Sequence, residues 1–278
     1  HKCLIEILKK KKKKEAMENF KINTIYNEDC FETMKQMPKI IDVVLTSPPY
    51  NTARTGTNQR AFDNYENRYD IHLDNKTDEE YLDWSVQLFN LYDKVLKPNG
   101  CVLYNISYSS ENTDLIWKFV AKIIAETAFT TADTIVWKKN CAIPNNVSPN
   151  KLTRMCEFVF VFARKAELGT FLMNKEISGQ SKTGQNYYEN LFNFIEAPNN
   201  DGSNDLNKAT FSSEFARKLL KMYAQPNATI YDSFMGTGTT AESCIIEKMN
   251  FVGSELSKAQ CEYASKRLNI RISQPTLF

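Results

Sequence analysis

The order of apolar and polar positions predicts strands that alternate with helices. Strands are expected at 22–26, 41–46, 101–106, 134–139, 157–164, 229–234 and 251–255, and helices at 29–37, 77–96, 112–126, 213–223, 241–249 and in a last segment that carries Tyr263 and Leu268. The run IDVVLT at 41–46 is apolar on both faces, which is typical of a central parallel strand. The alternation therefore predicts an α/β chain with a doubly wound, mainly parallel sheet.

One stretch departs from this alternation. From about 166 to 207, Asn, Gly, Ser and Lys become frequent and no periodicity persists. We interpret this stretch as an insertion within one domain that spans 17–278. Residues 1–16 include an unbroken run of lysines just before Met17, so we expect a basic, solvated N-terminal extension that need not belong to the native protein.

Composition and charge narrow the class of protein. With 42% hydrophobic residues among 278, the chain can bury a sizeable core, and its net charge of +2 means that a polyanion would bind a local basic surface. The chain shows neither an apolar run long enough to span a membrane nor the apolar core of a secretory signal, so we expect a cytoplasmic protein. Seven scattered cysteines without a C-x-x-C pair, and only two histidines, argue against a metal site or a disulfide framework.

A glycine-rich loop, GTGTTA at 236–241, follows a predicted strand and precedes a predicted helix. This is the G-x-G-x-x-A form of a nucleotide-binding turn, in which glycines let a ligand approach the backbone and the helix N-terminus receives its anionic part. Glu255 lies about 20 residues further on, where an acidic side chain accepts hydrogen bonds from ribose hydroxyls. Lysine is missing where a Walker phosphate loop needs it, so the loop predicts either a dinucleotide or S-adenosylmethionine as ligand.

The sequence TSPPYN at 46–51 ends the central strand, because proline donates no ladder hydrogen bond and fixes φ. Ligands bind at the carboxyl edge of such sheets, so a rigid loop there holds its groups ready. Ser47 Oγ and the nearby carbonyls become fixed acceptors, and Tyr50 becomes a stacking face. These parts suit a heteroaromatic amine: two acceptors on its hydrogens localise the nitrogen lone pair, which can then attack a methyl group without a strong base.

TSPPYN and DSFMGTGTT together resemble the amino-methylating (N4-cytosine or N6-adenine) DNA methyltransferases. The Ser-Pro-Pro-Tyr loop comes first and the glycine loop last, with the insertion between them, which is similar to the circularly permuted β group of that family. The resemblance extends over 22–268. It implies the Rossmann-like fold of S-adenosylmethionine-dependent methyltransferases, S-adenosylmethionine as cofactor, double-stranded DNA as substrate, and target recognition by the insertion.

The resemblance also implies roles for individual residues. The catalytic loop would consist of Ser47, Pro48, Pro49 and Tyr50, and the cofactor would be bound by Asp29, Cys30, Asp232, Phe234, Gly236, Gly238, Thr239, Thr240 and Glu255. Asp232 would hold the amino group of the methionine moiety, and Thr239 and Thr240 its carboxylate. Glu255 would bind the ribose, and Asp29 and Cys30 the adenine edge. The chain departs from the family at Ser233, where proline is more frequent, and at Asn207-Lys208, which replaces a His-Pro pair.

Several functions fit parts of these motifs. Serine at position 47 is typical of cytosine-N4 enzymes, whereas adenine-N6 enzymes usually have Asp or Asn there, so cytosine is preferred and adenine is the alternative. A protein-glutamine methyltransferase would resemble an NPPY motif that follows the cofactor loop, and the order here differs. A dinucleotide-dependent oxidoreductase would leave TSPPY unexplained, and a catalytically inactive DNA-binding module would leave both loops unexplained.

Cations mixed with aromatic residues mark two candidate DNA-binding segments. The loop after TSPPYN carries Arg54, Arg60 and Arg68 with Tyr65 and Tyr69, and the insertion carries Lys175, Lys182, Tyr187 and Tyr188. Cations bind phosphates, and aromatic rings stack on exposed bases. From the family likeness we also expect a homodimer, and a cognate restriction endonuclease that acts on the same site as part of a restriction-modification system.

Overall fold

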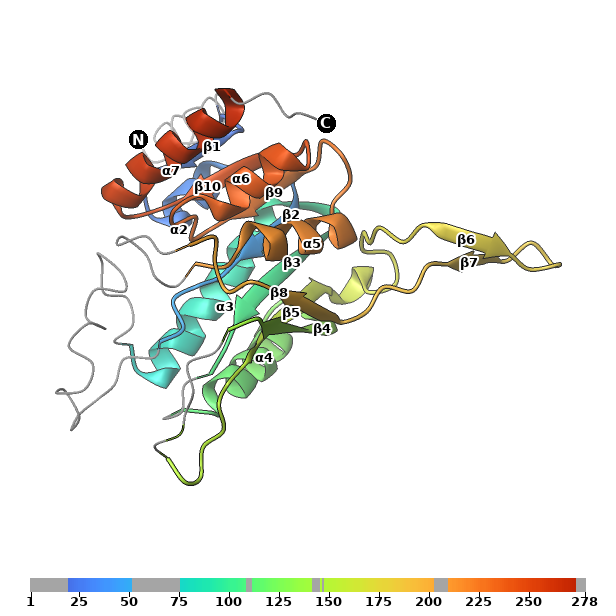
Figure 1. Ribbon diagram of the computed structural model, residues 1–278, viewed down its shortest axis with the longest axis horizontal. Helices are drawn as coiled ribbons and strands as arrows, with labels where there is room; N and C mark the ends of the chain where they lie inside the picture. The colour runs from blue at the N-terminus through green and yellow to red at the C-terminus, as the bar shows by residue number, and fades with distance from the viewer. Residues whose placement is uncertain are drawn as a thin grey trace, which may run out of the picture.

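Eight strands form the main sheet of the computed structural model, which describes residues 20–51, 76–108, 112–141, 146, 148–202 and 210–273 (Figure 1). The strands of this sheet are β1 (Thr24–Tyr26), β2 (Ile41–Thr46), β3 (Leu96–Ile106), β4 (Phe129–Lys139), β5 (Cys156–Arg164), β8 (Phe194–Ala197), β9 (Thr229–Asp232) and β10 (Asn250–Ser254). A separate pair consists of β6 (Ile177–Gln180) and β7 (Asn186–Tyr188). The helices are α2 (Cys30–Gln36), α3 (Asp78–Val95), α4 (Leu115–Glu126), α5 (Ser213–Tyr223), α6 (Thr239–Ile246) and α7 (Lys258–Ser273), with a short 3-10 helix, η2, at Lys165–Glu167.

Side-chain hydrogen bonds cap the first turns of helices α3 and α5. At the start of α3, the Thr77 hydroxyl accepts from the Glu80 N–H at 3.2 Å, and the Glu80 carboxylate accepts from the Thr77 N–H at 2.8 Å. This reciprocal pair is a capping box, which satisfies two N–H groups that the helix leaves unpaired. Ser212 caps α5 by accepting from the Phe215 N–H.

Several expected boundaries differ from the structure. Strand β4 begins at Phe129, five residues before the expected start. Helix α3 ends at Val95 and β3 begins at Leu96, so the KPNG segment at 97–100 lies inside the strand. It forms an irregularity there, since the register of β2 against β3 shifts at this point. The stretch 166–207 contains β6, β7 and β8, which have four, three and four residues and are too short for an alternating pattern to be visible.

The main sheet has the strand order β1-β10-β9-β2-β3-β5-β4-β8. Strand β5 is antiparallel to both of its neighbours, and all other neighbouring strands of this sheet are parallel. The predicted mainly parallel sheet is therefore confirmed.

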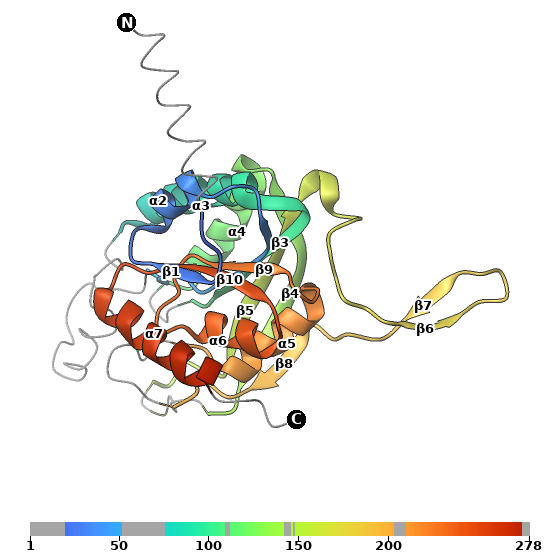
Figure 2. The same cartoon turned by 90° about the horizontal axis from the view of Figure 1, so that it is seen from above.

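Helices cover both faces of the sheet, which confirms the doubly wound arrangement (Figure 2). Helices α2, α3 and α4 pack on one face, where Phe89 meets Tyr104 and Phe162. Helices α5, α6 and α7 pack on the other, where Phe215 stacks on Trp137 with ring centroids 4.0 Å apart. Strand β2 lies between the two cores and so needs apolar residues in both registers, which explains the consecutive apolar residues Val43, Val44 and Leu45.

The centre of the sheet brings together two strands that are distant in the sequence. Strand β2 pairs with β9, with Val44 opposite Tyr231. From the end of β2 the chain passes through α3 to β3 on one side, and from the end of β9 it passes through α6 to β10 on the other. Strands that diverge in this way leave a crevice at their carboxyl ends, which is where open α/β sheets bind ligands. The fold therefore places the two predicted loops at one site.

The segment between β5 and β8 leaves the sheet at the amino ends of the parallel strands, opposite the crevice. Because β5 is antiparallel to β3, its last residues lie beside the start of the regular part of β3, with Ala163 opposite Cys101. Strands β6 and β7 then form a short antiparallel hairpin that projects from the body as an arm (Figures 1 and 2). Ile177, Tyr187 and Tyr188 are exposed on this arm.

The part of the chain that the structure describes contains no helix with the length and apolarity that crossing a membrane requires. The same residues contain no group of three or more His, Cys, Asp or Glu side chains placed to hold a metal ion.

Candidate functional site

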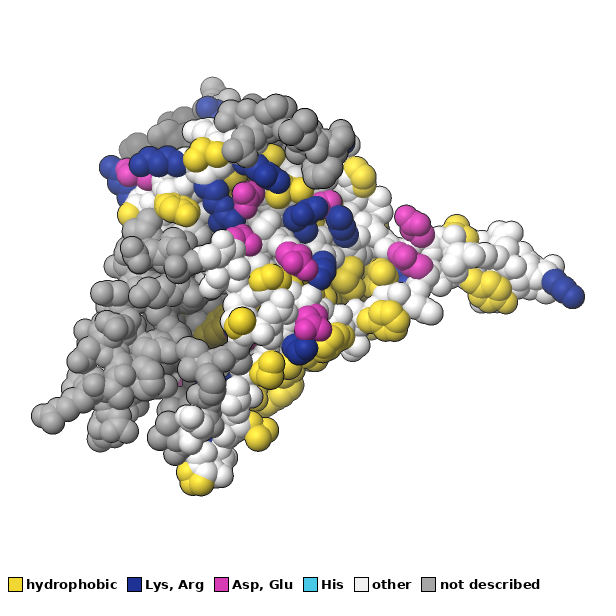
Figure 3. Space-filling model, in the orientation of Figure 1, with side chains coloured by type: hydrophobic (Ala, Val, Ile, Leu, Met, Phe, Trp, Pro, Cys, Tyr) yellow, Lys and Arg dark blue, Asp and Glu magenta, His cyan; other side chains and the backbone are white. Residues whose placement is uncertain are grey.

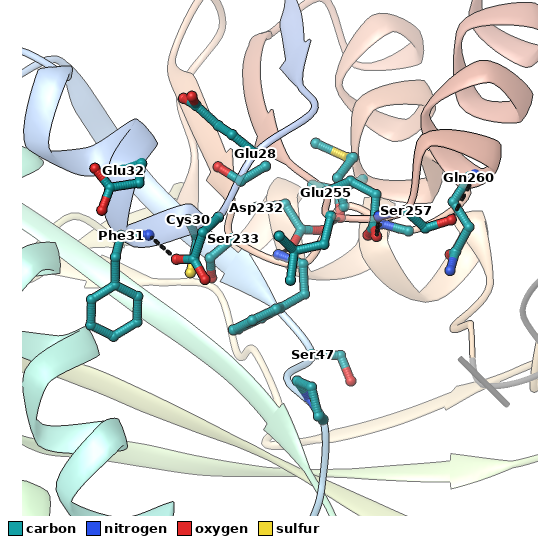
Figure 4. Close-up of a pocket in the computed structure, with 18 of the residues that line it drawn as sticks. Glu28, Cys30, Phe31, Glu32, Ser47, Asp232, Ser233, Glu255, Ser257 and Gln260 are labelled. Atoms are coloured by element: carbon teal, nitrogen blue, oxygen red, sulfur yellow. Dashed lines mark hydrogen bonds between the residues drawn. The ribbon is translucent and has the colours of Figure 1, made fainter. Parts of the chain in front are cut away.

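A cavity of about 500 Å³ opens at the crevice between β2 and β9 (Figure 4). Of the residues predicted from the sequence, those that line it are Asp29, Cys30, Ser47, Pro49, Asp232, Phe234, Gly236, Thr239, Thr240 and Glu255. Among the described residues, Pro48, Tyr50 and Gly238 were predicted for the site and lie outside this lining. The structure thus brings the Ser-Pro-Pro loop and the glycine loop to one cavity.

Asp232 ends β9 and is 2% exposed. Its Oδ1 accepts from Thr46 Oγ1 at 2.7 Å and from the Phe234 N–H at 3.0 Å, and its Oδ2 accepts from Thr240 Oγ1 at 2.5 Å. Burial raises the pKa of Asp232 to about 6, although these hydrogen bonds favour the charged form. A buried carboxylate of this kind is stabilised by a cation placed beside it, such as an ammonium group.

The loop between β9 and α6 contains two glycines with positive φ. Gly236 has φ of 54° and Gly238 of 87°, in the left-handed region that other residues rarely adopt. A Cβ at Gly238 would also lie only 2.9 Å from the Cβ of Ala264 in α7. Backbone conformation and packing against α7 therefore both require glycine at 238. Thr239 and Thr240 follow in the first turn of α6, the helix end that attracts anionic groups.

Glu255 follows β10 and joins two loops of the cavity. Its Oε2 accepts from the Gly236 N–H and its Oε1 from the Ser257 N–H, both at 2.8 Å. A carboxylate oxygen can accept more than one hydrogen bond, so these two bonds are compatible with binding of ribose hydroxyls by Glu255. Ser257 in turn accepts from the Gln260 N–H at 3.2 Å. The S-x-x-Q pattern of a helix start was the signal that could have identified these two lining residues.

An aromatic wall lies beside the start of α2. Asp29 caps this helix by accepting from the Phe31 N–H at 2.7 Å, and burial raises the pKa of the Cys30 thiol well above its usual value, so the thiol is neutral. The ring of Trp84 lies 6.3 Å from that of Phe31 and 5.7 Å from that of Phe234, and all three line the cavity. A wall of rings beside a neutral thiol suits a flat base. The sequence did not identify Phe31 and Trp84, because aromatic residues at helical spacing are typical of a core.

The catalytic loop is held by its neighbours on both sides. Thr46 ties its start to the glycine loop, and Ser47 faces the cavity (Figure 4). The side chain of Pro48 is buried, and the Pro49 carbonyl accepts from the Tyr81 hydroxyl of α3 at 3.0 Å. The expected rigidity of the loop thus has specific anchors.

Tyr50 points to a different set of partners. Its hydroxyl lies 3.0 Å from Ser47 Oγ, 3.2 Å from Asn105 Oδ1 and 3.1 Å from Glu157 Oε2. Its ring packs against the core that α3 and α4 cover. The structure therefore brings the Tyr50 hydroxyl to Ser47, and stacking of its ring on a base stays a prediction.

The predicted DNA-binding residues fall into two groups. Arg54, Arg60 and Arg68 lie outside the described residues, as does the Asn207-Lys208 pair. Lys175 and Lys182 belong to the arm and its base, at the sheet edge opposite the catalytic loop, so the structure does not bring them to the cavity.

The face covered by α5, α6 and α7 shows cations and acids side by side (Figure 3). Arg217 pairs with Glu247 at 2.5 Å, and Lys218 pairs with Glu214 at 2.6 Å. Because these cations are paired with acids, this face attracts a nucleic acid less strongly than a purely basic patch would.

The family model described as DNA methylase, for N6 and N4 methyltransferases, matches residues 41–266 of this chain. The chain belongs to this DNA methylase family. It is 25% identical over 282 residues to the type II methyltransferase M.MjaI of Methanocaldococcus jannaschii, which covers 89% of this chain and 93% of that protein. It is 23% identical to the type II methyltransferase M.HinfI of Haemophilus influenzae, over 92% of this chain and 70% of that protein.

Solved structures of DNA methyltransferases share the fold. The PvuII DNA methyltransferase, described as cytosine-N4-specific, matches with a TM-score of 0.67 and 16% identity, over 92% of this chain and 88% of that chain. The M1.HpyAVI complex with SAM matches with a TM-score of 0.57 and 23% identity, over 88% and 99%. The predicted methyltransferase fold and the N6/N4 DNA methylase family are therefore confirmed, and the circular permutation stays a prediction. The methyl donor of this family is S-adenosylmethionine, which leaves the dinucleotide-dependent oxidoreductase without support.

Proposed function

We propose that this DNA methyltransferase methylates N4 of a cytosine at a specific sequence in duplex DNA, as the modification enzyme of a restriction-modification system. The observation that carries the choice of cytosine is the serine at position 47, where the adenine-N6 enzymes of the family usually have Asp or Asn. In support, Ser47 faces the cavity into which the glycine loop also opens.

Two acceptors at the start of the catalytic loop would activate the amine. The amino nitrogen of cytosine is a poor nucleophile, because its lone pair is delocalised into the ring. Ser47 Oγ and the Pro48 carbonyl would accept from its two hydrogens, whereas the Pro49 carbonyl already accepts from Tyr81. Loss of one such preorganised group typically costs about 10²- to 10³-fold in rate. Ser47→Ala should therefore slow turnover by that factor and leave cofactor affinity unchanged.

S-adenosylmethionine supplies an electrophilic methyl group when it is bound. We assign its methionine amino group to Asp232, which is buried and has no cationic side chain as a partner within the part of the chain that the structure describes. Thr239 and Thr240 would bind the methionine carboxylate at the start of α6, and Glu255 the ribose. Asp29 and Cys30, beside the aromatic wall, would bind the adenine. In support of this assignment, these residues line one cavity.

The target base would have to leave the duplex to reach Ser47. Stacked neighbours block the approach of a methyl group perpendicular to the base plane, and enzymes that modify bases therefore flip the base out. Stacking on Tyr50 would offset part of the cost, since a base on an aromatic ring gains roughly 1 to 3 kcal/mol. Tyr50→Ala should then lower turnover more on paired duplex DNA than on a mismatched target.

Methylation of adenine N6 is the alternative, because two acceptors can bind the hydrogens of either exocyclic amine. Expression in a methylation-free host, followed by modification-sensitive sequencing, identifies the base and the recognition sequence together. N4-methylcytosine at one recurring sequence is the expected result. N6-methyladenine would mean that the serine at 47 does not select cytosine, while the cofactor site would stand.

We also propose that the enzyme is a homodimer and acts beside a cognate restriction endonuclease. Both proposals rest on the family likeness. Sedimentation at micromolar concentration that shows only a 32.0 kDa species would contradict the dimer.

A further inference from the structure

A polar cluster lies behind the catalytic loop, outside the lining of the large cavity. Three neighbouring strands contribute to it: Asn105 from β3, Glu157 from β5 and Lys139 from β4. Asn105 and Glu157 both contact the Tyr50 hydroxyl. This hydroxyl lies 3.0 Å from Ser47 Oγ. The cluster therefore links the sheet to the side chain that faces the cavity.

The chemistry of the partners fixes the direction of these hydrogen bonds. Asn105 donates its Nδ2 to the Phe158 carbonyl at 3.1 Å, so its amide presents Oδ1 to Tyr50. Glu157 presents a carboxylate oxygen, which accepts only. Tyr50 has a single hydroxyl hydrogen and must direct it to these two acceptors. The contact between Tyr50 and Ser47 then requires the Ser47 hydroxyl to donate and the Tyr50 oxygen to accept.

The hydrogen bonds link Ser47, Tyr50 and Glu157 in series, and an ion pair with Lys139 holds Glu157 at the end of this series. Lys139 Nζ contacts Glu157 Oε1, and the two side chains are 24% and 14% exposed. The Lys139 ammonium also lies over the Trp137 ring, 5.0 Å from its centroid. With one oxygen held by Lys139, Glu157 directs its other oxygen to Tyr50.

We propose that Glu157, held by Lys139, orients the hydroxyls of Tyr50 and Ser47 so that Ser47 presents a lone pair, and not its hydrogen, to the amino group of the target base. This inference rests on the proposed function. The single hydrogen of Ser47 is used on Tyr50, so Ser47 Oγ can only accept from the amine. If Tyr50 instead donated its hydrogen to Ser47, the Ser47 hydrogen would be released from Tyr50 and could point at the hydrogens of the amine. Glu157 and Lys139 are thus positioning residues that act through Tyr50.

Glu157→Gln tests this proposal with little change of shape. Glutamine can donate its amide hydrogens to the Tyr50 oxygen, which removes the fixed direction of the chain. Because hydrogen bonds to charged groups contribute more than neutral ones, single-turnover methyl transfer to DNA should fall about 10- to 100-fold. The affinities for S-adenosylmethionine and for DNA should not change. The matched control is Glu196→Gln, which removes the ion pair between Lys138 on β4 and Glu196 on β8. Glu196 is 53% exposed, and this variant should keep the full rate.

Tyr50→Phe separates orientation from a structural role. In the Tyr50→Phe background the hydroxyl chain is absent, so Glu157→Gln should have no further effect on the rate. A Glu157→Gln enzyme with the wild-type rate, or one whose defect persists in full beside Tyr50→Phe, would overturn the proposal while DNA methylation by the wild type would still support the proposed function.

A spectroscopic measurement keeps the two questions apart. In protein labelled with 13Cζ-tyrosine, the Tyr50 resonance, assigned by its loss in Tyr50→Phe, should shift in Glu157→Gln and not in Glu196→Gln. If the wild type methylates no DNA, the proposed function fails. The shift of the Tyr50 resonance then decides by itself whether Glu157, Tyr50 and Ser47 are linked by hydrogen bonds. An unshifted Tyr50 resonance would overturn it.

Discussion

The hydroxyl of Thr46 donates a 2.7 Å hydrogen bond to the carboxylate of Asp232, across 186 positions of the sequence. Both side chains are buried at the ends of adjacent strands, β2 and β9. Ser233 extends the contact, since its hydroxyl lies 3.2 Å from that of Thr46 and 2.6 Å from that of Tyr92 in α3. Ser233, where the family more often has proline, thus links the glycine loop to the catalytic loop and to α3.

Thr46→Val should weaken both the fold and the cofactor site. Valine has the shape of threonine without the donor, so the buried Asp232 would lose one of its hydrogen bonds. A bond to a charged group contributes about 1.5–3 kcal/mol, and the free energy of unfolding in urea should fall by that amount. Thr46→Ser keeps the hydroxyl and is the control. Equal unfolding free energies for the valine and serine variants would show that this bond does not stabilise the protein.

Binding of S-adenosylmethionine should weaken as the pH falls through about 6. The pKa of Asp232 is raised to about 6 by burial, and only the charged carboxylate attracts an ammonium group. Below that pH the dissociation constant should rise roughly tenfold per pH unit, and above pH 7 it should level off. Calorimetric titration from pH 5 to 8 measures this. Asp232→Asn should bind more weakly and without this pH dependence, and a flat profile in the wild type would exclude Asp232 as the titrating partner.

The same burial predicts that Asp232 opposes folding when it is charged. Its folded pKa of about 6 lies above the ordinary value of 3.8, so the stability that its proton confers is complete below about pH 4 and is lost as the pH rises through 6. Asp232→Asn should therefore raise the free energy of unfolding at pH 8, by up to about 3 kcal/mol. The gain should shrink toward pH 5. A variant less stable than the wild type at pH 8 would show that the three hydrogen bonds outweigh the cost of burial.

Cofactor binding should change tryptophan fluorescence through Trp84. Trp84 lines the cavity, whereas Trp117 is 53% exposed on α4 and Trp137 is buried against α5. Trp84→Phe keeps an aromatic ring in the wall and should abolish most of the change while retaining affinity. Trp117→Phe is the control and should keep the full signal. A signal that survives in Trp84→Phe would place the cofactor away from the aromatic wall.

The loops of the site could be predicted from the sequence because their signals are local. Pro-Pro after an apolar run ends a strand, and glycines between a strand and a helix mark a turn. Their meeting also followed from the parallel sheet, since such strands place their carboxyl ends at one edge. Hydrogen bonds such as that from Thr46 to Asp232 join positions distant in the chain, and no local pattern indicates them.

Other parts of the site depend on tertiary packing that the sequence does not show. The need for glycine at 238 comes partly from Ala264 in α7, so Gly238→Val would disturb this packing and is a poor test of ligand binding. The antiparallel course of β5 sends the arm with Lys175 and Lys182 to the edge opposite the catalytic loop. An apolar run such as EFVFVFAR has the same pattern in either strand direction.

Nucleoside analysis of DNA after methylation by the purified enzyme tests the central claim most directly. DNA without prior methylation is incubated with the enzyme and labelled S-adenosylmethionine, digested to nucleosides and examined by mass spectrometry. The account predicts labelled N4-methylcytosine, formed about 10²- to 10³-fold more slowly by Ser47→Ala. Labelled N6-methyladenine would contradict the choice of cytosine, and the absence of any labelled base would contradict the proposed function as a whole.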